Sequence, residues 1–442
     1  MKLFKKILLF VLVIVVITAF YNYPKLNLIS GFASKNMASN VFIAKRSAES
    51  VTENDNNIPL IKLAKTVVSE KSVVANVFGL MDRKTINRGG LGCVLVNNDY
   101  NEETPFYAPE RNRIKNNLPF PYGNNGIIDT ILPNVDYTQL QKSIAYAFSD
   151  PDTQKTRTVL IVHKDQIIGE KYAEGFTKDT PILGWSMTKS ITATLYGILQ
   201  KAKKINIDNY APVNSWLVDD RKNITINHLL RMQSGLEWDE DYKSISDVTK
   251  MLFLASDMTK AQEEKRAIAK PREIWNYSSG TSNLLMGILR KQFIYHEHYL
   301  NFPYNTLIDK IGMHSMLLEA DLESNYVGSS YAWATTRDWA KFGLLYLHRG
   351  NWNGEQIFNS SWVDYVTKPT ENSNGVYGAH FWLNAGGKYP DAPRDLYSAN
   401  GFQGQRVFII PSKDLVIVRT GLAGEDGFDF NSFLKSICDA IQ

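Results

Sequence analysis

Cysteine and clustered metal ligands are scarce in this sequence. Its 442 residues include only Cys93 and Cys438, too few for a disulfide framework or a cysteine-rich metal site. The two can form one bridge, but we expect each to be a small buried hydrophobe. The seven histidines form no His-x-x-x-His or His-Glu-x-x-His pattern, and His296 and His298 lie in a polar stretch. We therefore expect a protein without metal or cofactor.

An excess of charge of one sign is also missing. The 49 Lys and Arg residues nearly balance 45 Asp and Glu residues, for a net charge of +4. That balance gives no support for a nucleic-acid-binding surface, which would need a clustered basic face, so we expect no nucleic-acid partner. No motif repeats with a period of about 20–50 residues, which argues against a solenoid or propeller. The length allows about two or three domain-sized units. It leaves the oligomeric state open.

Long apolar runs are absent except for one, at residues 7–20, which follows Lys2, Lys5 and Lys6. A basic segment followed by an apolar segment is typical of an export signal. The run is short for a membrane span, and no strong cleavage site follows it. We expect residues 1–23 to be a signal peptide or an N-terminal anchor, attached to the membrane through residues 7–23. The protein would then lie in the periplasm or cell envelope.

The pattern divides the rest of the chain near residue 136. Residues 24–135 are polar and loop-rich, and we expect a loosely packed stalk and an extension. Beyond them, strands are expected near both ends of the region and helices between. The expected strands are 158–162, 166–172, 406–410 and 415–419, and the expected helices are 137–148, 186–203 and 428–441. With a mostly helical insertion at about 205–300, residues 136–442 predict an α+β domain with one antiparallel sheet.

A candidate nucleophile stands where the long helix begins. Ser186 and Lys189, three residues apart, project from the same face of a helix. A serine hydroxyl needs a base, and a lysine whose pKa is lowered by burial can serve. The helix N-terminus also favours developing negative charge. The alternative is that Ser186 simply caps the helix.

The same spacing recurs at Ser432 and Lys435, which we interpret as a surface pairing on the last helix. Context separates the two motifs, because Ser186 precedes an apolar helix. A third candidate, Tyr277, lies in Trp-Asn-Tyr-Ser-Ser-Gly, at an expected loop-to-helix junction. A tyrosine hydroxyl can share a proton with serine and lysine. The alternative is a tyrosine packed at a core edge.

In this order and spacing, Ser186, Lys189 and Tyr277 resemble the β-lactamase-like serine hydrolases, which include class C β-lactamases, D,D-peptidases and esterases. Residues 224–236 and 331–343 carry the likeness further, so that it covers about residues 136–442. Residues 90–93, 238–242 and 377–384 resemble the 6-aminohexanoate-dimer hydrolase branch. The resemblance implies a central antiparallel sheet flanked by helices.

The resemblance also implies roles. Ser186 would be acylated, and Lys189 and Tyr277 would shuttle its proton. Ser279 would stand where the family places a substrate-contacting amide, and Tyr242 would lie on a loop that closes over substrate. Aromatic residues near 275–304 and 377–382 either line an acyl pocket or pack helices against the sheet.

The family's third motif, Lys/His-x-Gly, is altered, because Phe402 replaces the cation. Gly404 still allows close backbone approach, and the N–H groups of Gln405 and Ser186 could form an oxyanion hole. No side chain at 402 can hold a substrate carboxylate, so an uncharged amide or ester fits better than a β-lactam. We expect an exported serine hydrolase. The alternatives are a penicillin-binding D,D-peptidase-like envelope protein and a catalytically silent binding protein of the same fold.

Overall fold

The computed structural model describes residues 2–97, 100–101, 103–114, 116–123, 126–128, 130–424 and 426–442. The chain forms two compact units. The N-terminal unit contains residues 1–88, 93–104 and 240–256, and the C-terminal unit contains residues 89–92, 105–239 and 257–442. A segment from the middle of the expected helical region therefore belongs to the N-terminal unit.

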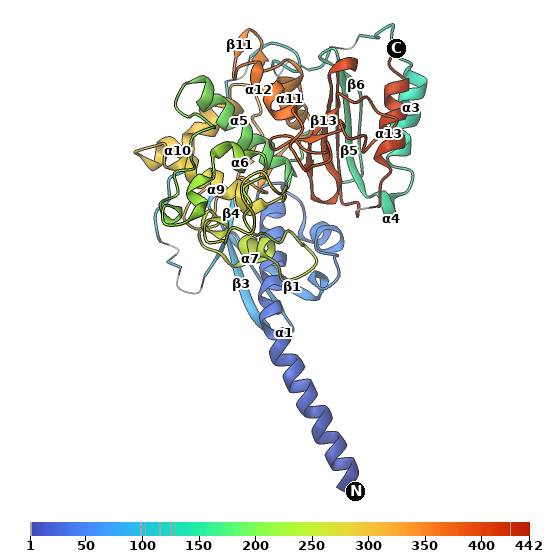
Figure 1. Cartoon of the computed structure of the whole chain (residues 1–442). Coiled ribbons are helices and arrows are strands. Elements are labelled where there is room, and N and C mark those ends of the chain that lie inside the picture. The colour runs from blue at the N-terminus through green and yellow to red at the C-terminus, as the bar shows by residue number, and fades with distance from the viewer. Residues whose placement is uncertain are drawn as a thin grey trace. The chain divides into compact units, whose positions relative to one another are not determined.

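A six-stranded antiparallel sheet organises the C-terminal unit (Figure 1), in the order β12-β13-β14-β15-β5-β6. Both expected hairpins are present and pair through their expected turns. The strands are β5 (Thr156–His163), β6 (Gln166–Tyr172), β12 (Trp382–Leu383), β13 (Tyr397–Gly401), β14 (Gln405–Ile410) and β15 (Leu415–Gly421). Strands from both ends of the domain meet where β15 pairs with β5, which confirms the predicted α+β class.

Each face of this sheet is covered by helices. Val407 and Ile409 of β14 belong to a core with α5 (Met187–Lys201) and α11 (Thr336–Leu347). Phe408 lies on the opposite face, in a core with α3 (Tyr137–Tyr146) and α13 (Phe430–Asp439). Alternate residues of a strand point to opposite faces, and because both faces are covered, residues 407–410 of β14 are all apolar.

Short helices and strands fill the remainder of the C-terminal unit. The helices are α4 (Pro151–Gln154), α6 (Ile226–Leu230), α8 (Lys260–Glu263), α9 (Ser279–Arg290), α10 (His296–Pro303) and α12 (Ser361–Thr367). A small sheet contains β7 (Ile182–Leu183), β8 (Leu317–Leu318) and β9 (Ala332–Ala334), and β10 (Asn351–Trp352) pairs with β11 (Glu355–Gln356). The small sheet fixes the chain that leads into α5, because Gly184 donates its N–H to Ala332 O at 2.8 Å.

The N-terminal unit has a four-stranded antiparallel sheet of its own, in the order β1-β2-β3-β4. Its elements are α1 (Lys2–Phe42), α2 (Ala48–Ser50), β1 (Ala64–Val68), β2 (Ser72–Val77), β3 (Leu80–Asn87), β4 (Cys93–Val96) and α7 (Asp247–Leu254). The second half of α1 packs on this sheet, where Ser34 donates to Val73 O at 2.9 Å. This packing differs from the loosely packed stalk that we expected after residue 24.

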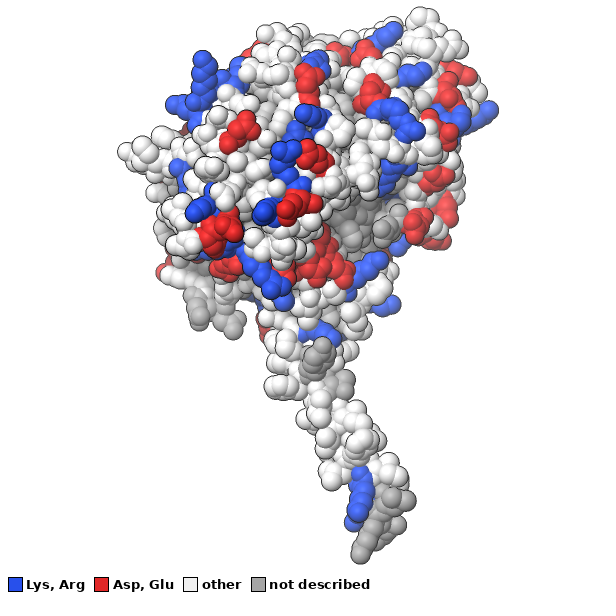
Figure 2. All heavy atoms as spheres, viewed as in Figure 1, with Lys and Arg blue, Asp and Glu red and all other residues white. Residues whose placement is uncertain are grey.

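The first half of α1 is different in character. Its apolar side chains are exposed, from Ile7 at 54% to Phe20 at 84%. Within the described part of the chain, no helix is both long and apolar enough to cross a membrane. On the face of the protein seen in Figure 2, acidic and basic side chains are interspersed, while most of this part of α1 carries no charge. Both cysteines are buried, as expected of small hydrophobes.

Candidate active site

Ser186 stands immediately before the first residue of α5. Its backbone is helical (φ −63°, ψ −7°), and its side chain does not cap the helix. Instead, its hydroxyl accepts a hydrogen bond from Lys189 Nζ at 3.0 Å. The role of a helix cap therefore does not explain this serine. Its side chain is half-buried, so the hydroxyl remains within reach of a small molecule.

Lys189 lies one turn into α5 and is only 1% exposed. The ammonium donates to Ser186 Oγ at 3.0 Å, to Ser279 Oγ at 2.8 Å and to Ser329 O at 3.1 Å. The lysine is buried because it lies in the interior part of α5, in which residues 187–199 are all buried. The lysine is thus held between two serine hydroxyls, an arrangement suited to moving a proton.

Tyr277 and Ser279 reach the site from the start of α9. Ser278 caps this helix by accepting the Thr281 N–H at 2.9 Å, and it donates its own hydroxyl to Gln262 Oε1 at 2.6 Å. Lys189 Nζ lies 4.8 Å from the centre of the Tyr277 ring. The expected loop-to-helix junction is confirmed, and it brings Tyr277 and Ser279 to the same ammonium group.

His380 is a buried neighbour of the lysine. Burial lowers its pKa to about 3, and the positive charge of Lys189 contributes to the shift. The neutral ring donates from Nδ1 to Leu230 O at 2.7 Å, so Nε2 accepts from the Ser282 hydroxyl at 2.9 Å. Both ring nitrogens have partners, and this histidine is a positioning group for the surrounding helices.

The turn between β13 and β14 borders the nucleophile. A Cβ on Gly401 would lie 2.0 Å from Gly184 O, so only glycine allows this contact two residues before Ser186. Trp185, between them, has a left-handed backbone (φ +48°), which is strained for a bulky residue. The Phe402 ring packs edge-on against Trp185, with ring centres 5.7 Å apart.

Gly404 and Gln405 complete this turn. Gly404 has a φ of +82°, and a Cβ there would lie 2.5 Å from the Arg419 side chain. The Gln405 side chain is buried and is used structurally. Its Nε2 donates to Phe402 O at 3.1 Å and to Gly421 O at 2.5 Å, while its Oε1 accepts from Gly421 N at 3.0 Å. The role of its backbone N–H in an oxyanion hole stays a prediction.

Tyr277 belongs to a cluster of four aromatic rings. Its ring centre lies 5.8 Å from that of Tyr377 and 5.3 Å from that of Trp382, and Trp275 lies 5.4 Å from Tyr377. Tyr377 is buried, whereas the other three are half-buried and leave part of each ring accessible. The cluster therefore packs the site and also offers an apolar surface next to Tyr277.

Tyr242 belongs to the N-terminal unit, where its hydroxyl donates to Glu240 Oε1 at 3.3 Å. Its role as a residue that closes over substrate stays a prediction. Sequence reasoning missed Ser329, whose carbonyl oxygen accepts from Lys189. No sequence signal identifies such a residue, because any amino acid has a carbonyl group.

An antiparallel sheet between two helical layers, with a buried lysine beside a serine at a helix start, defines the β-lactamase type of fold. The sequence profile of the Beta-lactamase family matches residues 153–421, more than half of the chain. The protein therefore belongs to the Beta-lactamase family.

Solved structures show the same fold. A protein from Bacillus anthracis named as a 6-aminohexanoate-dimer hydrolase matches with a TM-score of 0.56 and 21% identity, over 68% of this chain and 79% of the other. A penicillin-binding protein homologue from Caulobacter crescentus has a TM-score of 0.53 and 13% identity, over 71% and 98%. A family VIII carboxylesterase has a TM-score of 0.51 and 15% identity, over 71% and 100%. No curated protein sequence matches significantly.

Proposed function

We propose that this protein is a serine hydrolase that cleaves an amide or ester bond through an acyl-enzyme on Ser186. The observation that carries the proposal is the buried Lys189 ammonium, 3.0 Å from Ser186 Oγ and 2.8 Å from Ser279 Oγ. A lysine removed from water loses part of its preference for the charged form, so it can act as a base.

The proposed reaction has two halves. Lys189, as the neutral amine, takes the proton of Ser186 while Oγ bonds to the substrate carbonyl carbon. The N–H groups of Ser186 and Gln405 stabilise the negative oxygen, and collapse breaks the C–N or C–O bond. The leaving group takes a proton from Lys189, directly or through Tyr277. Water then attacks the acyl-enzyme and releases the acid and free Ser186.

The turn around Phe402 favours an uncharged substrate. Where the resembled family has a cation, Phe402 places an aromatic ring against Trp185, 5.7 Å between ring centres. Half-buried Tyr277 and Trp382 add apolar surface on the side of α9. A neutral acyl group next to the scissile amide or ester suits these surroundings better than a carboxylate.

A fluorophosphonate probe tests the proposal, because it forms a covalent bond with an activated serine. Wild-type protein should be labelled at Ser186, and Ser186→Ala should not. Ser432→Ala is the matched control and should label like wild type. Folded wild-type protein that stays unlabelled, or equal labelling of Ser186→Ala, contradicts the proposal. Stable labelling by fluorescent penicillin would instead support the penicillin-binding alternative.

We also propose that the protein is exported and stays attached to the cell envelope through residues 7–23. The support is the exposed apolar surface of α1, such as Leu9 at 62% and Phe10 at 65%, behind the basic residues at the N-terminus. Fractionation of cells that express the full chain tests this. Wild type should partition with the envelope, and a Val13→Lys variant should lose that location. Wild type found in the cytosolic fraction contradicts it.

A further inference from the structure

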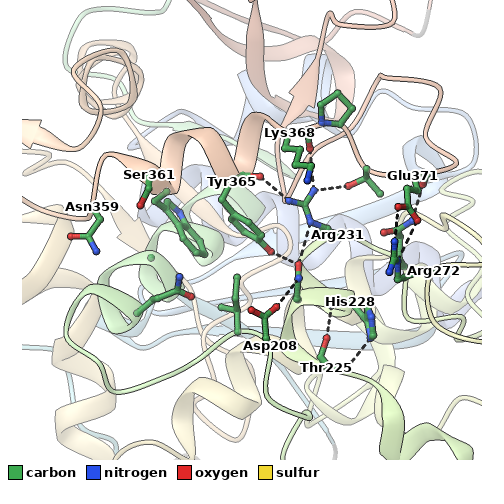
Figure 3. A pocket seen from close by; sticks show the side chains of 18 of the residues that line it. Asp208, Thr225, His228, Arg231, Arg272, Asn359, Ser361, Tyr365, Lys368 and Glu371 are labelled. Carbon is green, nitrogen blue, oxygen red and sulfur yellow. Dashed lines mark hydrogen bonds and ion pairs between the residues drawn. The ribbon is translucent and has the colours of Figure 1, made fainter.

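A cavity lies in the C-terminal unit (Figure 3). Its volume is about 580 Å³, within the range of small-molecule sites. The end of α5, the loop after it, α6 and the segment that contains α12 form its walls. None of the residues assigned to the hydrolase reaction lines it, and the chemistry described above does not use it.

Arg231 provides a fixed positive charge in this cavity. Its guanidinium donates to Tyr365 O at 2.9 Å, to Lys368 O at 3.0 Å, to Asn227 Oδ1 at 3.2 Å and to Thr370 Oγ1 at 3.3 Å, which leaves one N–H for a ligand. It also stacks on the Tyr365 ring, with Cζ 4.5 Å from the ring centre. All these acceptors are neutral, so within the part of the chain that the structure describes the positive charge is held in place without an acidic partner. A guanidinium that is ordered in advance binds a carboxylate with little further loss of entropy.

The positive charge on the Arg231 side of the cavity is not cancelled by the charged residues Arg272, Glu371 and Lys368. Arg272 and Glu371 pair with each other at 2.6 Å and neutralise one another. Burial and the charge of Arg272 lower the pKa of His228, which keeps that ring neutral near pH 7. Lys368 is exposed at the rim, has no acidic partner within ion-pair distance among the described residues, and lies on the same side as Arg231.

Hydrogen-bond acceptors mark another part of the wall. Asp208 accepts from Asn227 Nδ2 at 3.0 Å through Oδ1, which leaves Oδ2 for a ligand. Gln200 Oε1 is buried and has no hydrogen-bond partner. The Asn227 side chain contacts both parts of the wall, because its amide nitrogen donates to Asp208 and its Oδ1 accepts from Tyr365 and Arg231. An orphaned buried acceptor and an available carboxylate oxygen both suit a ligand with several N–H donors.

We propose that this cavity binds a short zwitterionic peptide, with its carboxylate against Arg231 and Lys368 and its ammonium against Asp208 and Gln200. In Figure 3, Lys368 and Asp208 lie on opposite sides of Arg231, as the two ends of such a ligand require. The amides of the peptide would meet the polar side chains between these ends. The cavity would then be a second binding site, whose occupant need not be the substrate.

Isothermal titration calorimetry with the full-length Ser186→Ala protein tests the proposal without turnover. Trialanine is the probe, with N-acetyl-trialanine and trialanine amide as analogues that lack one charged end. We expect trialanine to bind, and each analogue to bind at least about tenfold more weakly, equivalent to about 1.4 kcal/mol. No binding of trialanine at millimolar concentration, or equal binding of either analogue, overturns the proposal.

Variants locate the binding. Lys368→Met and Asp208→Asn each change an exposed side chain, and each should weaken trialanine binding at least about tenfold. The matched controls, Lys178→Met and Asp179→Asn, change an exposed ion pair elsewhere and should leave binding unchanged. Unchanged affinity in both cavity variants places the peptide elsewhere and overturns the proposal. Melting curves identify any variant that fails to fold.

Discussion

The chain contains the same four-residue pattern twice, and the two copies differ in almost every physical respect. Lys189 is 1% exposed and donates to two serine hydroxyls. The side chain of Lys435 is 51% exposed and pairs with Asp439, one turn further along α13. This pairing raises the pKa of Lys435, so its amine is protonated near neutral pH.

The comparison shows that spacing alone does not make a nucleophile. In both helices the serine and lysine share a face, because residues three apart do so in any α-helix. At α13 that face meets solvent, where water and a carboxylate stabilise the ammonium. At α5 it meets the protein interior, where a second serine and a backbone carbonyl contact the lysine. Burial and neighbours make the difference.

Removal of the lysine should give the largest contrast. Lys189→Met keeps the side-chain length but removes the proposed base, so we expect kcat/KM to fall about 10³-fold. Lys435→Met should change it less than about twofold, because the site is exposed and remote. Hydrolysis of p-nitrophenyl esters by the two variants provides the measurement. Retention of more than a tenth of the activity by Lys189→Met would falsify its role as base.

The second prediction concerns the backbone that packs close to Ser186. In Gly401→Ala, the new Cβ would meet Gly184 O at 2.0 Å and push the β13–β14 turn away from the nucleophile. We expect kcat/KM to fall about 10²-fold, the effect of a shift of about 1 Å at a reacting group. Gly424→Ala meets no atom within 4 Å and is the control. Similar kinetics in both variants would refute the positioning argument.

Burial near Lys189 should also make the stability of the folded protein fall at acid pH. The pKa of His380 is about 3 in the folded protein, below its ordinary value of 6.5. Between these values the unfolded chain binds the proton and the folded protein does not, so stability falls as the pH drops from 6.5 towards 3.

This one residue can contribute a slope of up to about 1.4 kcal/mol per pH unit. His380→Gln should be less stable at pH 7 but should show a shallower slope, measured by urea unfolding at several pH values. Parallel slopes for the two proteins would rule out His380 as the source.

The smallest effect is expected at the exposed motif. Asp439→Ala removes the partner of Lys435, and exposed ion pairs contribute little to stability. We expect the melting temperature to change by less than about 2 °C, and activity to stay at the wild-type level. Calorimetric melting at low and high salt checks this. A large loss would show that the α13 motif is more than a surface pair.

Much of the C-terminal unit could be predicted from local pattern. The alternation and turn residues of both hairpins, and the apolar face of α5, are properties of contiguous segments. The order of Ser186, Lys189 and Tyr277 likewise pointed to one site. In the structure, Ser186 and Tyr277 both lie beside the Lys189 ammonium. The hairpins and the helix could be predicted because each depends on neighbours in the chain, whereas the roles of the three residues stay a prediction.

Other features could not be predicted, because they depend on contacts between distant segments. Ser329 contributes only a backbone carbonyl, 140 residues from Lys189. Residues 240–256 join the N-terminal unit, where the Arg83 side chain donates to Phe253 O at 2.9 Å. The polar composition of the chain after residue 24 predicted a loosely packed stalk. In the structure, residues from this region form the second half of α1, which is packed.

The sequence by itself determined the α+β class, the antiparallel hairpins and the presence of a Ser-x-x-Lys pair on each of two helices. Only the tertiary structure decided which pair is buried, which neighbours each lysine has, and that Ser186 does not cap its helix. The physical reason is that helix geometry is local. The dielectric surroundings and hydrogen-bond partners of a side chain are set by segments far away in the chain.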